Sequence, residues 1–152
     1  MRKRIIDPSA ETLSSEEWLD LEKVAQVEIT SETPANPIDS ALVPGVDLGW
    51  AAAQSGEQTL RLLFDEPIGV KRIRLVFKES NYRRTQEFVL RWSNDGVTFK
   101  DIVRQQYNFN PPGTEVEEYD IDLGGVTALE LNIVPDISGG PAIASLAELR
   151  IA

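Results

Sequence analysis

Apolar and polar residues alternate along most of this chain, and the pattern predicts its secondary structure. In one segment, Leu60, Leu62 and Phe64 fall on one face while the residues between them fall on the other. A period of two is typical of β-strands with one buried and one solvated face. Eight segments show this alternation: Val24–Thr30, Gln58–Phe64, Val70–Phe77, Gln86–Ser93, Thr98–Arg104, Glu115–Ile121, Val126–Val134 and Ile143–Ile151.

The residues between these segments favour turns and hairpins. Ser93–Gly96 lies between two alternating segments, and its glycine can supply the positive φ of a tight turn. Asp65–Gly69 and Gly124–Gly125 have turn composition as well. Many short strands joined by turns predict an all-β antiparallel sandwich. No repeat, low-complexity tract or linker divides the chain, so we expect a single domain over residues 1–152.

Three segments do not follow the strand pattern. Residues 1–23 are predicted to form an N-terminal extension packed on the sandwich, in which Ser14 and Glu17 have the capping-box spacing of a short helix. An open end of the sandwich is the expected contact of Trp18, Leu19 and Leu21. Ser31–Glu57 and Gln105–Gly113 are predicted to be long loops. Loops of this length are usually functional or disordered, and the aromatic residues of the second argue against disorder.

Composition narrows the chemistry, because the chain has no histidine and no cysteine. Histidine is the commonest general base and transition-metal ligand, and disulfides require cysteine. A net charge of −10 disfavours nucleic acid and anionic membranes as partners. No apolar run approaches the roughly 20 residues of a membrane span, and the first residues lack the apolar core of an export signal. We therefore predict a cytoplasmic protein that does not bind nucleic acid and is not inserted in a membrane.

The densest group of carboxylates, Glu115–Asp120, is the main candidate for catalysis. A glycosidase would hold two acids roughly 5–10 Å apart across a cleft, with the pKa of one raised by burial. Acids that alternate along a strand instead indicate a solvated outer face. We therefore predict that the protein is not an enzyme and has no catalytic residues; a hydrolase would depend on Glu117 or Glu118.

The order of several motifs resembles a known family. Asn36–Asp39 follows the first strand, Trp50 follows a loop, Phe88–Phe99 combines a strand with a Ser-Asn-Asp-Gly turn, and Ala147–Leu149 opens the last strand. From Val24 to the C-terminus this order is similar to the discoidin domain (the coagulation-factor type C domain) and to family 32 carbohydrate-binding modules. The resemblance implies a galactose-binding-like fold, an eight-stranded antiparallel jelly-roll β-sandwich. It also implies loops at one end that bind glycans, lipids or proteins.

A structural calcium ion is a further implication of the resemblance. Calcium takes about 6–8 oxygen ligands from carboxylates and carbonyls. Asp39 matches the first acid of the family pattern and Glu148 the last, while Ser40 and Ala41 replace a glycine and a second acid. Asp47, in the same long loop, is the candidate replacement. The alternative is that Asp39 caps a turn and Glu148 is a solvated strand residue.

The resemblance also points to ligand-binding residues. Glycan-binding members place an arginine just before the strand that begins with Phe88, and Arg83 or Arg84 matches that position, with Asn81 and Tyr82 beside it. Guanidinium and amide groups suit sugar hydroxyls, and an aromatic ring suits the apolar side of a sugar. The second long loop adds three candidates, Tyr107, Asn108 and Phe109. The alternatives are that the arginines pair with nearby acids and that the aromatics plug the end of the sandwich.

Two functional hypotheses follow. The first is a non-catalytic module that binds carbohydrate through loops at one end of the sandwich, with calcium as its one candidate cofactor. The second is an intracellular protein–protein interaction module or an assembly subunit, whose acidic surface would favour a basic partner. Both hypotheses remain open at the level of sequence.

Overall fold

The computed structural model describes residues 18–46 and 48–152. The helix predicted near Ser14 and the candidate calcium ligand Asp47 lie outside the described residues. Along the chain the elements are α1 (Leu21–Val24), β1 (Ala25–Ile29), α2 (Asp39–Leu42), β2 (Trp50–Ala51), β3 (Gln58–Glu79), β4 (Arg84–Ser93), β5 (Lys100–Phe109), β6 (Gly113–Val134), β7 (Ser145–Leu146) and β8 (Glu148–Ile151).

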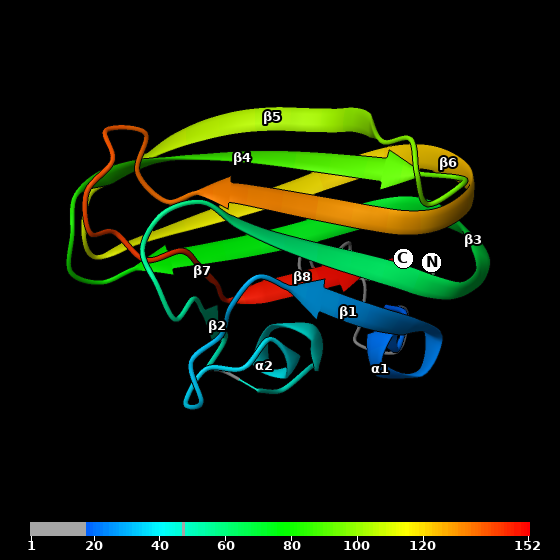
Figure 1. The fold of residues 1–152 in the computed structure, drawn as a ribbon, viewed down its shortest axis with the longest axis horizontal. Coiled ribbons are helices and arrows are strands. Elements are labelled where there is room, and N and C mark those ends of the chain that lie inside the picture. Colours follow the sequence, from blue (N-terminus) through cyan, green and yellow to red (C-terminus); the bar gives the residue numbers. More distant parts are fainter. Residues whose placement is uncertain (1–17, 47) are drawn as a thin grey trace, which may run out of the picture.

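Two strands of 22 residues each, β3 and β6, pair with one another and organise the fold. Their ribbon bends where Asp65–Gly69 meets Gly124–Gly125, and the pairing register shifts in this region. The bend folds the ribbon back, so that each strand contributes to both layers of a sandwich (Figure 1). The four strands predicted separately around these two turns are therefore the halves of β3 and β6.

The two layers differ in width. The first contains β1, the first half of β3, the second half of β6, β4 and β5, all antiparallel to their neighbours. The second contains β8, the second half of β3 and the first half of β6. A small two-stranded sheet, β2 and β7, completes the fold. The protein is an eight-stranded antiparallel jelly-roll β-sandwich, which confirms the predicted fold class.

The prediction of a long loop over Gln105–Gly113 is wrong. β5 continues to Phe109 in register with β4, and β6 begins at Gly113. Tyr107 and Phe109 face the core, whereas Asn108 is exposed. The segment is a strand whose outer face is polar, and its amide side chains gave it the composition of a loop.

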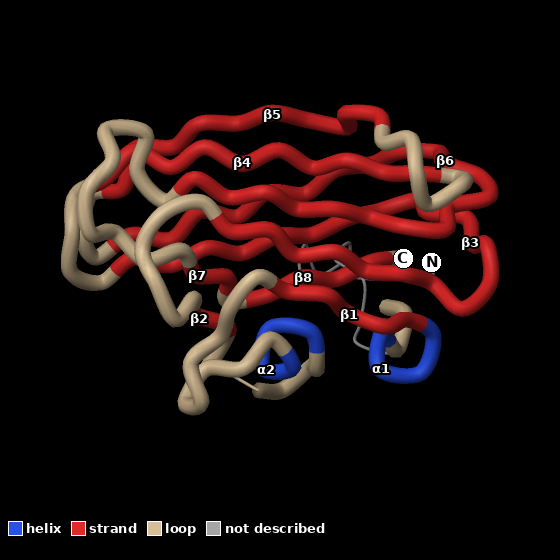
Figure 2. The backbone as a smooth tube through the Cα atoms, viewed as in Figure 1, coloured by secondary structure: helices blue, strands red, loops and turns tan. Residues whose placement is uncertain are grey.

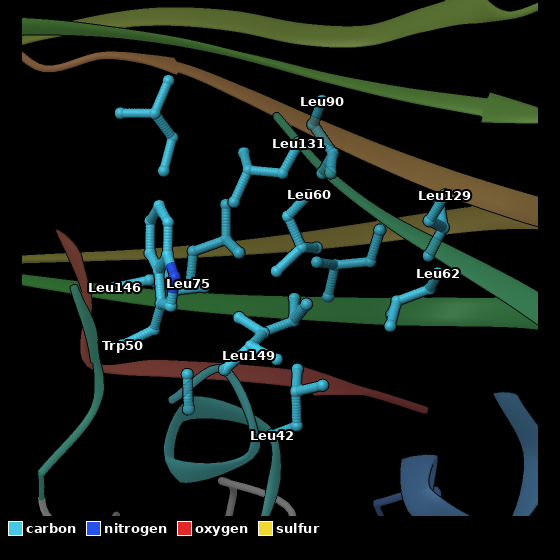
Figure 3. Packing of buried hydrophobic residues seen from close by; sticks show 14 of the residues in the cluster. Leu42, Trp50, Leu60, Leu62, Leu75, Leu90, Leu129, Leu131, Leu146 and Leu149 are labelled. Carbon is cyan, nitrogen blue, oxygen red and sulfur yellow. The ribbon is translucent and has the colours of Figure 1, made fainter. Parts of the chain in front are cut away.

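Leucine-rich packing fills the space between the layers. The buried cluster takes leucines from both halves of the β3–β6 ribbon, from β4 and from β8: Leu60, Leu62, Leu75, Leu90, Leu129, Leu131 and Leu149. Figure 3 shows Trp50 beside Leu146, and Leu42 of α2 directed toward the strands. Leu21, near the end of the predicted N-terminal extension, is buried in the same cluster. Each such side chain contributes about 1.5–3 kcal/mol when it is buried.

The two ends of the sandwich carry different structures. The connections 80–83, 110–112 and 135–144 gather at one end, on the left in Figures 1 and 2, which we call the loop end. The β4–β5 hairpin and the bends of β3 and β6 lie at the other end. Hydrogen bonds from Ile137 N to Thr85 O (2.9 Å) and from Gly56 N to Ala142 O (3.4 Å) attach the 135–144 connection to its neighbours. Among the helices of residues 18–46 and 48–152, none is long and apolar enough to span a membrane.

Candidate functional site

Two hollows lie at the loop end, one on each side of the β3–β4 connection. The Tyr82 pocket has a volume of about 380 Å³ and is lined by residues that include Ala51, Lys78, Asn81, Tyr82, Ile143 and Ser145. The Arg83 pocket has a volume of about 300 Å³ and is lined by residues that include Arg83, Thr85, Asn108, Asn110, Asp136 and Ser138. Four of the seven predicted ligand-binding residues, Asn81, Tyr82, Arg83 and Asn108, therefore line one pocket or the other with side chains that are not buried.

Tyr82 is the most exposed aromatic side chain of the loop end, at 68% of its surface. Its position is set by Glu79, whose Oε2 accepts hydrogen bonds from Asn81 N (3.0 Å) and Tyr82 N (3.4 Å). Glu79 Oε1 accepts a hydrogen bond from Arg84 Nε (2.6 Å). Burial alone would raise the pKa of Glu79, but these hydrogen bonds outweigh it and hold the pKa below its usual value. A charged carboxylate therefore anchors the connection that presents Asn81 and Tyr82.

Arg84 supports this connection from inside the sandwich, with only 1% of its side chain exposed. Besides its bond to Glu79, Nη1 donates to Gln86 Oε1 (3.1 Å) and Pro135 O (2.8 Å). The guanidinium lies 4.6 Å from the centre of the Phe109 ring, and Phe109 is itself 2% exposed. Both residues border the Arg83 pocket, but their side chains are buried, and Arg84 forms an ion pair with Glu79.

The remaining candidates occupy intermediate positions. Arg83 lines its pocket and forms no ion pair with a described residue. Asn108 is exposed at the same pocket and accepts a hydrogen bond from Thr85 Oγ1 (2.5 Å). Tyr107 is half-buried on the inner face of β5, where its ring meets that of Phe109 edge-on at 4.9 Å. Tyr107 thus lies below the loop end instead of on it.

Two carboxylates lie on the inner face of β6 below the loop end. Glu115 pairs in register with Phe77, and Glu117 pairs with Leu75, so both share a face with the core. Glu115 is 3% exposed, and neither of its carboxylate oxygens has a hydrogen-bond partner among the described residues. Burial, followed by the neighbouring Glu117, raises the pKa of Glu115 to about 8. The prediction that the acids of this strand share one solvated face is therefore wrong for Glu115.

The candidate calcium ligands Asp39 and Glu148 lie in α2 and in β8 respectively. Asp39 begins this short helix and borders a hollow formed with α1 and β1, whereas Glu148 borders one formed with the 45–46 segment and β8. Between α2 and β8 lies the guanidinium of Arg150, 3.3 Å from Glu148 and hydrogen-bonded to Ala41 O. No cluster of three or more acids suited to a metal occurs within 18–46 and 48–152. A calcium ion needs about 6–8 oxygen ligands around one point, and the two described candidates border different hollows.

Several residues of the two pockets were not among the predicted candidates. Lys78, Ile143 and Ser145 line the Tyr82 pocket, and Asp136 lines the Arg83 pocket. Lys78 is the last outward-facing residue of β3, so the alternation of that strand could have indicated it. Ile143 comes from the distant β6–β7 connection and Ser145 is the first residue of β7, and only the fold brings them to Tyr82.

Solved structures with the same fold provide the comparison. The family 32 carbohydrate-binding module of NanJ from C. perfringens, in complex with galactose, is 16% identical over 88% of this chain and 96% of its own, with a TM-score of 0.66. A further family 32 module from Clostridium perfringens, in complex with GalNAc-β-1,3-galactose, is 17% identical over 89% and 99%, with a TM-score of 0.65. A pectin-binding carbohydrate-binding module is 19% identical over 85% and 90%, with a TM-score of 0.62.

The chain therefore has the galactose-binding-like fold of family 32 carbohydrate-binding modules, as the sequence resemblance predicted. No protein-family model matches the sequence, and no curated protein matches it. Allantoicase from Saccharomyces cerevisiae is also similar, at 15% identity and a TM-score of 0.59, but this chain covers only 39% of it. The fold thus occurs both in binding modules and as a part of a larger protein that is named as an enzyme.

Proposed function

We propose that the protein is a non-catalytic module that binds carbohydrate in the Tyr82 pocket. The observation that carries this proposal is the exposed ring of Tyr82 beside a hollow of about 380 Å³, together with the Asn81 amide. The pocket opens at the loop end, on a connection held in place by Glu79 and Arg84. A preformed, concave and partly apolar surface is typical of small-ligand sites.

The chemistry of the pocket suits a sugar. Tyr82 and Ile143, which is 41% exposed, offer apolar surface for the C–H side of a pyranose ring. Asn81 has both donors and an acceptor for hydroxyl groups, and Ser145 adds a hydroxyl of its own. Ile143 stands in a connection that lacks an aromatic residue, so stacking depends on Tyr82 alone among the residues of this pocket.

Two further observations support binding without catalysis. The similar structures are named as carbohydrate-binding modules, and their printed ligands include galactose and 4,5-unsaturated mannuronic acid. The Glu79 carboxylate that borders the pocket is already bonded to Arg84 and to two backbone N–H groups. The strongly perturbed carboxyl of Glu115 lies on the inner face of β6 and does not line the pocket.

Isothermal titration or saturation-transfer NMR with a panel of neutral and acidic oligosaccharides tests the proposal. We expect binding to at least one panel member with a Kd in the micromolar to millimolar range, which corresponds to about 4–8 kcal/mol. Tyr82→Ala should weaken this binding by at least about tenfold, or about 1.4 kcal/mol, because the variant loses the apolar ring surface that the sugar would cover. Thermal unfolding of the variant should match that of the parent, because the Tyr82 side chain is 68% exposed.

Val97→Ala is the matched control, because Val97 is 82% exposed and belongs to the hairpin at the opposite end. This variant should bind the saccharide as tightly as the parent. If no saccharide binds at millimolar concentration, the proposal is wrong, and the hypothesis of a protein–protein interaction module takes precedence. Equal weakening by Tyr82→Ala and Val97→Ala would also contradict it.

A further inference from the structure

Most lysine and arginine side chains of the described residues form ion pairs with carboxylates, but a few do not. Within the described ranges, most lysines and arginines lie within 4.0 Å of a carboxylate; the exceptions are Lys78, Arg83 and Lys100. Lys100 lies at the opposite end, with its ammonium 5.5 Å from the centre of the Trp92 ring. The other two line the Tyr82 pocket and the Arg83 pocket respectively. Unpaired positive charge is therefore found beside both hollows of the loop end.

The carboxylates near Lys78 and Arg83 differ in the hydrogen bonds and ion pairs that they already form. In the Tyr82 pocket, Glu79 accepts three hydrogen bonds, one of them from Arg84. Lys78 also borders a hollow with Glu148, whose carboxylate lies near Arg74 and Arg150, so Lys78 forms no ion pair with a described residue. In the Arg83 pocket, Asp136 accepts a hydrogen bond from Ser138 N (3.0 Å) but forms no ion pair with a described residue. Lys78 therefore offers the stronger anion contact, and Arg83 a weaker one that Asp136 offsets.

We propose that the saccharide bound at the loop end is acidic, with a uronate carboxylate on Lys78 and its chain continuing toward Arg83. This inference rests on the proposed carbohydrate-binding function. An ammonium and a guanidinium each form charge-assisted hydrogen bonds with a carboxylate, and these are roughly twice as strong as neutral ones. The excess of negative charge elsewhere on the protein does not oppose this contact strongly, because charges beyond about 8 Å are screened at physiological salt.

Matched pairs of oligosaccharides test this inference. Oligomers of galacturonate, mannuronate and glucuronate are each titrated beside their carboxyl-reduced, neutral counterparts. We expect one acidic oligomer to bind about 5- to 10-fold more tightly than its neutral counterpart, as one charge-assisted contact allows. Lys78→Gln should abolish this preference and leave the affinity for the neutral oligomer unchanged, and Arg83→Gln should reduce the preference about two- to threefold.

Lys100→Gln is the control, since it removes the same charge from the third unpaired cation at the other end. It should leave the preference for acid intact. If neutral and acidic members of each pair bind equally, the inference about acidity is wrong while the proposed function stands. If no member of any pair binds, the proposed function itself fails. A preference that Lys78→Gln and Lys100→Gln reduce equally would show a general charge effect and would also overturn the inference.

A second inference concerns the position that the fold family gives to calcium. Arg150 is 5% exposed, and its Nη1 donates to Ala41 O (2.8 Å) and Leu149 O (2.8 Å). Its Nη2 donates to Val43 O (3.4 Å), and its Nε lies 3.3 Å from Glu148 Oε1. The carbonyl oxygens after Asp39 and the carboxylate of the last strand thus surround a cation that belongs to the chain itself.

We infer that the Arg150 guanidinium replaces calcium in joining the α2 segment to β8. A guanidinium carries one charge and five directed donors, so it can bond several carbonyls and a carboxylate without a metal. The melting temperature of the protein should therefore change by less than about 1 °C in EDTA or in millimolar calcium chloride, since a ligand that does not bind the native state does not stabilise it. A rise of several degrees with calcium would overturn the inference.

Arg150→Met adds a second measurement. This substitution leaves three carbonyls and Glu148 without their cation, so the melting temperature should fall by about 5 °C or more. Arg72→Met is the control, because Arg72 pairs with an aspartate that is 80% exposed. It should lower the melting temperature by no more than about 2 °C. Equal effects of the two substitutions would contradict a bridging role for Arg150.

Discussion

The first half of β6 carries acidic residues on both of its faces, and the two faces differ in how these acids are compensated. On the outer face each acid meets a cation of the adjacent strand β3, and we call these pairs the outer ladder. The pairs are Arg74–Glu118 (2.5 Å), Arg72–Asp120 (2.9 Å) and Lys71–Asp122 (2.6 Å). These side chains keep about a quarter or more of their surface in solvent.

On the inner face, Glu115 and Glu117 belong to what we call the inner cluster, together with Arg84 and Gln86. Arg84 is the one cation of this set, and its Nε is bonded to Glu79. Arg84 Nη2, Gln86 Nε2 and both oxygens of Glu115 have no hydrogen-bond partner among the described residues. Buried polar atoms without partners cost about 1–3 kcal/mol each unless water reaches them.

Strand register explains the difference. Along β3, Arg74 pairs with Glu118 and Arg72 with Asp120, whereas the residues opposite Glu115 and Glu117 are apolar. Side chains alternate between faces with a period of two, so one residue of spacing decides whether an acid meets a cation or the core. The same residue type on the same strand is therefore paired with a cation and partly exposed on one face, whereas burial on the other face raises the pKa of Glu115.

Removal of the cation from the inner cluster should have the largest effect. In Arg84→Met, Glu79 loses its partner, and the bond to Pro135 O is lost as well. Breaking a buried ion pair from one side destabilises a protein by about 3–5 kcal/mol. Urea denaturation at pH 7 measures this loss. Arg72→Met on the outer ladder is the control and should cost less than about 1 kcal/mol; equal losses would remove the contrast between the two regions.

Glu115→Gln should have the next largest effect, and its sign depends on pH. The folded-state pKa of about 8 lies above the value of about 4.3 expected for an unfolded glutamate. Between these values the folded protein keeps a proton that the unfolded chain has released, so the stability of the parent falls as pH rises toward 8. Glutamine does not titrate. The variant should therefore match the parent near pH 5 and exceed its stability by at least about 1 kcal/mol at pH 9.

Urea denaturation of both proteins at pH 5, 7 and 9 measures this difference. Glu118→Gln, on the outer ladder, serves as the control for the loss of one carboxylate. Because Glu118 is bonded to Arg74, this control should lose a little stability at every pH of the series instead of gaining it at high pH. If Glu115→Gln and the parent lose the same stability between pH 5 and 9, the titration of Glu115 does not cause the fall in the parent's stability with pH.

The same alternation that separates the two faces made most of the fold predictable. It indicated every long strand, but it divided β3 and β6 at their turns, because a bend within a paired strand and a turn between strands use the same residues. Asp65–Gly69 and Gly124–Gly125 are examples. Only the partner strand, which remains paired on both sides of the bend, distinguishes the two cases. The pairing partner cannot be identified from the residues around the bend, so the local sequence does not contain this information.

The candidate site was predictable in part, for a related reason. Arg83 and Arg84 match the family motif equally well, yet Arg84 is in phase with Gln86 and Phe88 and therefore faces inward. Period two alone separates the exposed arginine from the buried one. Ile143 could not be assigned in this way, because it reaches Tyr82 through a connection some sixty residues away in the chain. A pocket built from distant segments requires the fold.

The outer ladder itself should show the smallest effects, and these should depend on salt. Glu118→Gln removes one partner of Arg74, which lies 3.8 Å from a second carboxylate, Glu148. We expect a loss of about 0.5–1 kcal/mol at low ionic strength that shrinks in 1 M salt, where the screening length is about 3 Å. Asp122→Asn, in a pair whose side chains are 69% and 83% exposed, should cost less still. Urea denaturation at two salt concentrations measures both. A loss above about 2 kcal/mol that salt does not change would mean that the outer ladder behaves like a buried network of ion pairs. The two faces of β6 would then differ only in the protonation of their carboxyl groups.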